Sequence, residues 1–263
     1  MKYVIVTGAY GGMGYAAVRA FKDKGYYVFA LDRRVKEAED GVMPIEVDLT
    51  STSEIEAAYE KIREVTDRVY AIVHFAGMYN LDSLVEMSEK DFTRIFDVNV
   101  FSAYRVNKVF LPLLGEGSRI IITTSELAPL DPLPFTGIYA VTKAALDKYA
   151  YSLRMELQLL GISVAVLRPG AVDTGMLGVS TTALDRFCDE TELYSCNAER
   201  FKRIVDGVEA RKVSPEKVGR LAVKILETKR PRQVYKINRN PLLLLLNLLP
   251  RRLATYIIKL ILK

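Results

Sequence analysis

The sequence predicts an α/β fold, with a doubly wound parallel sheet of about seven strands and helices on both faces. Short β-branched runs alternate with amphipathic stretches along most of the 263 residues, and this alternation is typical of parallel strands joined by helical crossovers. A glycine-rich turn, GAYGGMG, separates the first apolar run from the first amphipathic stretch. Half of the residues are hydrophobic, which suffices for one large core. We therefore expect a single domain over residues 1–240.

Composition excludes several classes of protein. The formal net charge is +5, but much of the basic excess lies in the last quarter of the chain, so it does not indicate a nucleic-acid-binding domain. Cys188 and Cys196 form neither a disulfide framework nor a metal-ligand pattern. We predict free thiols, no metal site and a cytoplasmic protein. A core strand begins close to the first residue, so we expect no targeting segment.

The first strand, residues 3–7, leads directly into the glycine-rich turn. Glycines at 8, 12 and 14 let the backbone turn tightly and approach a pyrophosphate, which would sit at the positive N-terminus of the next helix. An ordinary strand-to-helix turn can show the same glycines. The position between the first strand and the first helix favours dinucleotide binding.

The second strand, YYVFALD, ends on Asp32, where a carboxylate would meet the adenosine ribose hydroxyls of NAD. A 2′-phosphate would be repelled there, and the glycine loop supplies no Lys or Arg to bind one. Arg33 and Arg34 follow immediately and weaken this argument, and Asp32 also has a simpler interpretation as the end of a strand. We expect NAD to be favoured, with NADP as the alternative.

The next two runs carry two further polar residues. VMPIEVDLT is predicted as a strand ending at Asp48, which is either an adenine contact or part of the start of the next helix. That helix has Ser51 or Ser53 as its cap. The fourth strand, VYAIVHFAG, contains His74, the only histidine. We expect His74 to be a hydrogen-bonded core residue without a catalytic role.

Residues 88–111 are predicted as one long helix with Asn99 near its middle. A buried asparagine needs hydrogen-bond partners, so Asn99 either stabilises a local kink or holds a water. The fifth strand, SRIIITTS, ends on Ser125. Because parallel strands end at one edge of the sheet, Ser125 should lie at the same edge as Gly8 and Asp48.

Tyr139 and Lys143 stand four residues apart at the start of a predicted helix. Both side chains should therefore project from one face. A neighbouring ammonium favours the phenolate, so the pKa of Tyr139 should fall toward neutrality and make the phenol a general acid or base. The same spacing also occurs where a buried ring lies beside a solvated amine.

The sixth strand, ISVAVLRPG, ends in a loop where the nicotinamide end of a cofactor would lie. Residues 176–212 are more polar and less periodic, and we expect a helical insertion that covers the site. A helix with Pro215 in its first turn and a final strand, RQVYKI, complete the predicted domain.

Residues 241–263 form an apolar and basic tail. The uninterrupted apolar run, 242–246, is far shorter than the about 20 residues that span a bilayer. Arg251, Thr255, Lys259 and Lys263 fall on one stripe of a predicted amphipathic helix. Such a helix can lie on an anionic membrane, pack against a partner subunit or cover the pocket, and in each case we expect its leucines to be covered.

Together these motifs resemble the short-chain dehydrogenase/reductase family over nearly the whole chain. The sequence is similar to the family's cofactor loop at Thr7, Gly8, Gly12 and Gly14, to its adenine-side aspartate at Asp48, to its asparagine, serine and YxxxK residues at Asn99, Ser125, Tyr139 and Lys143, and to its PG motif at Pro169, Gly170 and Thr174. Two features depart from the family. Its NNAG is HFAG at 74–77, and the interval before Tyr139 is long and holds three prolines, which makes Thr124 the alternative to Ser125.

The resemblance implies a Rossmann fold and an NAD(P)-dependent oxidoreductase. Tyr139 would exchange a proton with the substrate, Lys143 would hold the nicotinamide ribose and lower the pKa of Tyr139, Ser125 would orient the substrate oxygen, and Asn99 would complete a relay through a water. The implied cofactor contacts are Thr7, Gly8, Gly12, Met13, Gly14, Asp32, Arg33, Asp48, Leu49, Ala76, Gly77, Tyr139, Lys143, Pro169, Gly170, Val172 and Thr174.

The substrate implied by the resemblance is a small alcohol or ketone. The stretch around SLRMELQLLG is similar to the hydroxysteroid and retinol dehydrogenase branch, which suggests an apolar secondary alcohol such as a steroid or retinoid. The alternatives are an NADPH-dependent carbonyl or 3-oxoacyl reductase and a non-catalytic dinucleotide-sensing protein. We also expect a homodimer or homotetramer.

Overall fold

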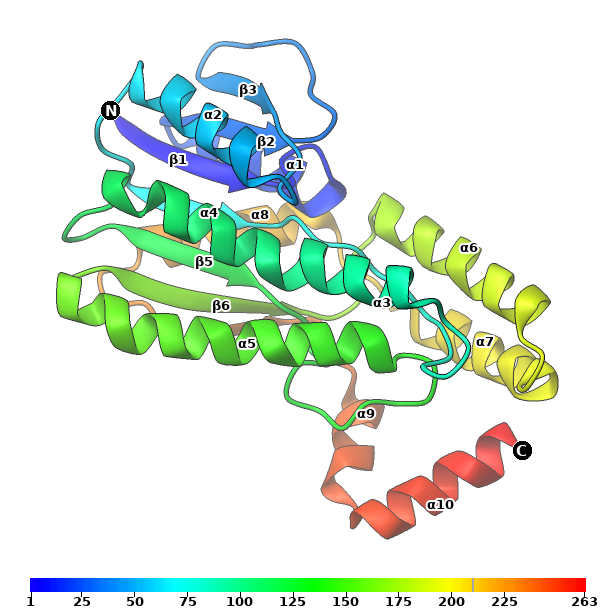
Figure 1. The fold of residues 1–263 in the computed structure, drawn as a ribbon. Helices are drawn as coiled ribbons and strands as arrows, with labels where there is room; N and C mark the ends of the chain where they lie inside the picture. The colour runs from blue at the N-terminus through cyan, green and yellow to red at the C-terminus, as the bar shows by residue number, and fades with distance from the viewer. Residues whose placement is uncertain (210) are drawn as a thin grey trace.

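The computed structural model describes residues 1–209 and 211–263 and contains the predicted parallel sheet (Figure 1). Its strands are β1 (Lys2–Thr7), β2 (Tyr26–Asp32), β3 (Val42–Glu46), β4 (Ala71–His74), β5 (Arg119–Thr123), β6 (Ser163–Pro169) and β7 (Val234–Ile237). All seven are parallel, in the order β3-β2-β1-β4-β5-β6-β7. The strand order reverses between β1 and β4, and ligands of such sheets bind outside the carboxyl ends at that point.

Helices cover both faces of the sheet, as predicted. Residues of α1 (Gly12–Asp23) and α8 (Pro215–Glu227) share one apolar cluster with the strands, whereas residues of α2 (Thr52–Arg63), α4 (Ser102–Phe110) and α5 (Gly137–Leu157) form the clusters on the other face. The remaining helical segments are α3 (Glu89–Phe96), α6 (Gly175–Glu190), α7 (Ser195–Glu209), α9 (Pro241–Leu248), α10 (Arg251–Leu262) and short turns at Asp97–Phe101, Leu111–Leu113 and Gln158–Leu160.

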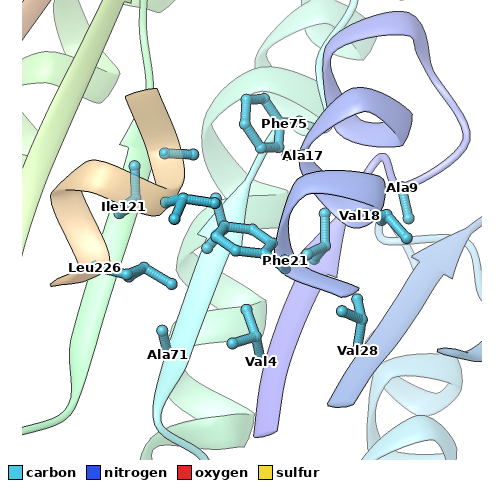
Figure 2. Packing of buried hydrophobic residues seen from close by; sticks show 14 of the residues in the cluster. Val4, Ala9, Ala17, Val18, Phe21, Val28, Ala71, Phe75, Ile121 and Leu226 are labelled. Carbon is cyan, nitrogen blue, oxygen red and sulfur yellow. The ribbon is translucent and has the colours of Figure 1, made fainter. Parts of the chain in front are cut away.

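The core lies against the middle of the sheet, where the strands are apolar on both sides. Figure 2 shows Phe21 of α1 between strand residues such as Val4 and Ala71 and Leu226 of α8. Phe21, Val4 and Leu226 have no exposed surface. This packing fixes α1, and with it the glycine loop that precedes it, relative to the central strands.

The predicted helix over 88–111 is interrupted. It begins at Glu89 with Ser88 as its cap, but Asp97–Phe101 forms a π-turn between α3 and α4. Turns of this kind are rare overall and are frequent at functional sites. Asn99 lies in this turn and is buried. The third strand also stops earlier than predicted, at Glu46, two residues before Asp48.

The segment predicted as an insertion, 176–212, contains all but the first residue of α6 and all of α7, and residue 210 lies outside the described residues. The proline-rich loop before α5 docks against these helices through Phe135. Its ring centroid lies 4.7 Å from that of Phe187 and 5.4 Å from that of Phe201. The extra length of the loop therefore has a packing role.

The tail forms α9 and α10, which project from the body beside the loop before α5 (Figure 1). Among the described residues, no helix is both long and apolar enough to cross a membrane. In the single chain Leu242, Leu245 and Leu248 are exposed, so their cover by a membrane or a partner subunit stays a prediction. The opposite side of α9 is the one that faces the body.

His74 is a buried, hydrogen-bonded core residue, as expected. Its Nε2 lies 2.9 Å from Oδ1 of Asn107, whose amide nitrogen donates to the Tyr149 hydroxyl. Burial lowers the pKa of His74 to about 4, against an ordinary value of 6.5. The ring is therefore neutral in the folded protein at physiological pH.

This burial predicts a specific loss of stability in mild acid. Below pH 6.5 the unfolded chain binds a proton at His74 that the folded chain does not bind until the pH approaches about 4. The contribution to the free energy of unfolding is thus fully present above pH 6.5 and falls by about 2 kcal/mol between pH 7 and pH 5. Urea titrations at both pH values should show this loss in the wild type.

The control is His74→Gln, which keeps a hydrogen-bonding group beside Asn107 but does not titrate. Its stability should fall by about 2 kcal/mol less than that of the wild type between the same pH values. Equal losses in the two proteins would contradict the assignment of this pH dependence to His74.

Candidate functional site

The glycine loop joins β1 to α1 at the point where the strand order reverses. Gly8 has φ = 64°, a conformation that favours glycine. A Cβ on Gly14 would lie 2.0 Å from the Gly8 carbonyl oxygen, and one on Gly12 would lie 2.5 Å from Cγ2 of Thr174. The loop is therefore closely packed on itself and on the PG loop after β6. The hydroxyl of Thr7 accepts the N–H of Ala76, in the segment after β4, at 3.4 Å.

Asp32 stands beside this loop. Its Oδ2 accepts the N–H of Tyr10 at 2.9 Å, and its Oδ1 accepts the N–H of Arg33 at 2.7 Å. The carboxylate is half-buried and Arg33 is exposed. The structure thus places the acidic residue of β2 next to the candidate dinucleotide loop, which is where the sequence predicted it.

Asp48 already has local partners. Its Oδ1 accepts the N–H and the hydroxyl of Thr50 at 2.9 and 2.8 Å. Partial burial opposes ionisation of Asp48, but these hydrogen bonds hold its pKa below the ordinary value. These hydrogen bonds fit a role of Asp48 at the start of α2, whose cap is Ser51, and the adenine contact stays a prediction. The side chain of Leu49 packs in the core beside it.

Two of the four candidate catalytic residues, Asn99 and Lys143, meet at Gly77. A Cβ on Gly77 would lie 3.2 Å from Oδ1 of Asn99 and 3.3 Å from Nζ of Lys143. Lys143 donates to the Thr123 carbonyl at 3.3 Å, and its Nζ lies 5.7 Å from the centre of the Tyr139 ring. The glycine therefore permits the close approach of the amide and the ammonium at this edge.

Ser125, and not Thr124, faces Tyr139. The Ser125 and Tyr139 side chains form a hydrogen bond. Thr124 donates to Asp147 at 3.3 Å, and Arg168 binds the same carboxylate with two hydrogen bonds of 2.9 and 2.6 Å. The two adjacent residues thus serve different purposes, and the long loop after Ser125 does not displace it from the site.

The side chain of Asn99 is hydrogen-bonded directly to two other segments of the chain. Its Oδ1 accepts the N–H of Met78 at 2.7 Å, and its Nδ2 donates to the Met78 carbonyl and to the Thr142 hydroxyl, each at 3.0 Å. Asn99 lies in a local distortion of the helix, which fits the first of its two predicted roles, and the role through a water stays a prediction. The amide joins the π-turn to the segment after β4 and to α5.

The electrostatics of Tyr139 differ from the prediction. Burial raises the pKa of Tyr139 to about 12, although the hydrogen bond from Ser125 opposes this and the charge of Glu126 adds to it. Burial also lowers the pKa of Lys143 to about 8. The expected fall in the pKa of Tyr139 is therefore wrong for the chain by itself, because burial of the phenol away from water outweighs the hydrogen bond that lowers its pKa. At neutral pH the phenol holds its proton and Lys143 is mostly charged.

Tyr139 lies in the wall of an apolar pocket with about 1150 Å³ of empty space, open to solvent. Polar groups at one end include Ser125, Glu126, Tyr139 and Lys143. The pocket also contains predicted cofactor residues, namely Met13, Gly77, Pro169, Gly170, Val172 and Thr174. Its apolar lining comes from several elements: Phe75, Met78, Tyr79, Leu127, Leu133, Phe201, Ile204, Val205 and Leu243.

Sequence reasoning missed Glu126, and it named cover of the pocket only as one of three roles for the tail. Glu126 directly follows Ser125, and its Oε2 accepts the N–H of Asn240 at 2.6 Å. Desolvation raises the pKa of this carboxyl group. Leu243 then lines the pocket from the tail. The position of Glu126 next to Ser125 was a signal for this residue, but nothing local to the tail predicted that Asn240 would reach the segment after β5.

Comparison with known proteins gives the family. A family model described as short chain dehydrogenase matches residues 2–185. The chain belongs to the short-chain dehydrogenase family. It is 32% identical to mouse estradiol 17-beta-dehydrogenase 2 over 191 residues, which cover 67% of this chain and 50% of that enzyme. The match thus spans half the length of the mouse protein.

Two further short-chain dehydrogenase relatives cover more of the chain. A 3-ketodihydrosphingosine reductase of Bacteroides thetaiotaomicron is 25% identical over 229 residues, 87% of this chain and 84% of that protein. The solved structure of an alcohol dehydrogenase from Thermococcus sibiricus, complexed with 5-hydroxy-NADP, has a TM-score of 0.75 at 23% identity and covers 92% of this chain and 99% of that one. The fold and the class, an oxidoreductase of this family, follow from these matches.

Proposed function

We propose that the chain interconverts a secondary alcohol and a ketone on an apolar substrate, with NAD favoured over NADP. The observation that carries this proposal is the hydrogen-bonded pair of Tyr139 and Ser125 at the polar end of an otherwise apolar pocket. A hydroxyl pair of this kind can bind one substrate oxygen and exchange a proton with it. The name of the mouse relative, an estradiol dehydrogenase, supports an apolar polycyclic substrate.

The residues at the carboxyl edge fit a nicotinamide dinucleotide. The glycine loop leaves backbone N–H groups at the start of α1 free of side-chain bulk, Asp32 stands where ribose hydroxyls would bind, and Lys143 is mostly charged at neutral pH. A bound nicotinamide would supply the hydride acceptor or donor. Tyr139 then exchanges the proton, Ser125 orients the substrate oxygen, and Lys143 binds the nicotinamide ribose.

A reductase is the second candidate. Because burial raises the pKa of Tyr139 to about 12, its phenol keeps the proton that carbonyl reduction requires. Arg33 is exposed beside Asp32 and offers a positive charge to a 2′-phosphate, which supports NADPH as the reductant. The Bacteroides relative is named as a ketone reductase. A non-catalytic dinucleotide sensor is the third candidate.

A substrate screen tests the three candidates. Sterols, retinoids and simple secondary alcohols are assayed with NAD and NADP, and the matching ketones with NADH and NADPH, by absorbance of the reduced nicotinamide. We expect turnover of an apolar alcohol with kcat/KM at least about tenfold higher for NAD, and loss of much of this preference in Asp32→Asn, because the repelling charge is removed. A preference for NADPH and ketones selects the reductase, and cofactor binding without turnover selects the sensor.

The oligomeric state of the chain is also a proposal. The outer sides of α4 and α5 expose Tyr104, Val141, Tyr151 and Met155. An apolar surface on two adjacent helices is suited to an isologous contact. We propose that these helices form the interface of a homodimer or homotetramer.

A further inference from the structure

Polar contacts hold the tail against the body along its length. Glu126 accepts the N–H of Asn240 just before α9, at 2.6 Å. Arg251 binds the carboxylate of Asp131 with two hydrogen bonds of 2.9 and 3.0 Å at the start of α10. Near the end of α10, Asn197 of α7 donates to the Leu262 carbonyl at 2.6 Å. The orientation of the two helices is therefore defined.

One side of each tail helix packs against the rest of the chain. Leu243 of α9 lines the pocket. Leu262 of α10 is only 8% exposed and packs in the apolar cluster that contains Phe187 of α6 and Phe201 of α7. Each helix thus has an inner side with an apolar contact.

The outer sides are apolar as well. In α9, Leu242, Leu245 and Leu248 recur at helical spacing and are 66%, 60% and 81% exposed. In α10, the side chains turned away from the body are Leu253, Tyr256, Leu260 and Ile261, which are 45% to 60% exposed. We call these seven side chains the outer tail face. A contiguous group of this kind on a helix pair marks an interaction surface.

The charges of the tail identify the partner. Residues 241–263 contain Arg251, Arg252, Lys259 and Lys263 and no Asp or Glu. Among the ion pairs of the described residues, Arg251 has Asp131, while none involves Arg252, Lys259 or Lys263. Exposed leucines beside free cations suit an anionic lipid surface. A second copy of this tail would bring like charges together in a symmetric contact.

We propose that the outer tail face is a docking surface for an anionic lipid bilayer. Neither tail helix is long enough to span the bilayer, because α9 has 8 residues and α10 has 12, against the about 20 that are needed. We therefore place α9 and α10 in the plane of the bilayer, with the leucines among the acyl chains and the basic side chains at the headgroups. Because Leu243 lines the pocket from the inner side of α9, docking places one wall of the pocket next to the lipid. Binding itself does not depend on the reaction proposed above.

Vesicle flotation with the full chain tests the docking surface. Vesicles of phosphatidylcholine with and without phosphatidylserine serve as probes, and neither substrate nor cofactor is needed. We expect the chain to float with the anionic vesicles, with at least about tenfold less recovered on neutral ones, and to be released by high salt. The double variant Leu248→Asp/Leu260→Asp should lose at least about tenfold of the bound fraction.

The matched control is Leu159→Asp, which changes a leucine that is 82% exposed outside the tail. It should float like the wild type. The proposal is overturned if the wild type does not float with anionic vesicles, or if Leu159→Asp loses binding to the same extent as the tail variant. Analytical ultracentrifugation identifies the occupant in that case. If the wild type does not float and its mass is larger than that of the tail variant, a second copy of the chain covers the outer tail face, and the proposal is overturned.

Discussion

Tyr139→Phe is expected to lower kcat by roughly 100- to 10,000-fold, the range that a positioned proton donor or acceptor supplies. The substitution removes the hydroxyl that bonds to Ser125 and keeps the ring, whose centre lies 4.5 Å from that of Tyr79 in an edge contact. The affinity for the cofactor should change by no more than about threefold, since the glycine loop and Lys143 are intact. Steady-state kinetics and a fluorescence titration with reduced cofactor measure the two effects.

The control for this substitution is Tyr149→Phe in the same helix. Tyr149 is also largely buried, and its hydroxyl accepts a hydrogen bond from Asn107 at 3.1 Å, but it does not line the pocket. Loss of that bond should cost about 1 kcal/mol of stability and leave kcat near the wild-type value. Near-normal turnover in Tyr139→Phe would show that another group exchanges the proton.

Gly14→Ala is expected to weaken cofactor binding at least about 100-fold, which corresponds to about 3 kcal/mol. The added methyl group would lie 2.0 Å from the Gly8 carbonyl oxygen and 3.1 Å from the Cα of Ala9. Backbone cannot move aside as a flexible side chain can, so the loop must open where the pyrophosphate would bind. Titration with NADH and NADPH gives the dissociation constants, and circular dichroism reports whether the sheet is retained.

Gly11→Ala provides a matched methyl group in the same loop. Gly11 has φ = −71° and is exposed, and its nearest neighbour would be 3.4 Å away. This variant should bind the cofactor within about threefold of the wild type. If both variants bind normally, the loop does not hold the pyrophosphate.

Local patterns in the sequence predicted the fold because each strand and crossover carries its own signal. The apolar run of each strand, the glycine turn after β1 and the cap of α2 at Ser51 all lie within a few residues of the feature they define. The alternation of elements then leaves few topologies open. The π-turn at Asn99 had no such signal, because it depends on Met78 and Thr142, which come from other segments.

The sequence predicted which residues form the candidate site, but it did not predict their pKa values. Ser125, Tyr139 and Lys143 converge because parallel strands end at one edge, which the sequence order already implies. The pKa values depend on how completely the surrounding segments exclude water, and that is a property of the whole fold. The same reason applies to the contact of Glu126 with Asn240, which joins residues 114 positions apart.

Side-chain hydrogen bonds hold helix α5 at three positions along its length. Thr142 receives the amide of Asn99, Asp147 receives the guanidinium of Arg168, and Tyr149 receives the amide of Asn107. A rotation or a slide of α5 by one residue would break all three contacts at once. The register of the whole helix therefore positions the Tyr139 hydroxyl, and the geometry that we propose for proton exchange is set before any ligand binds.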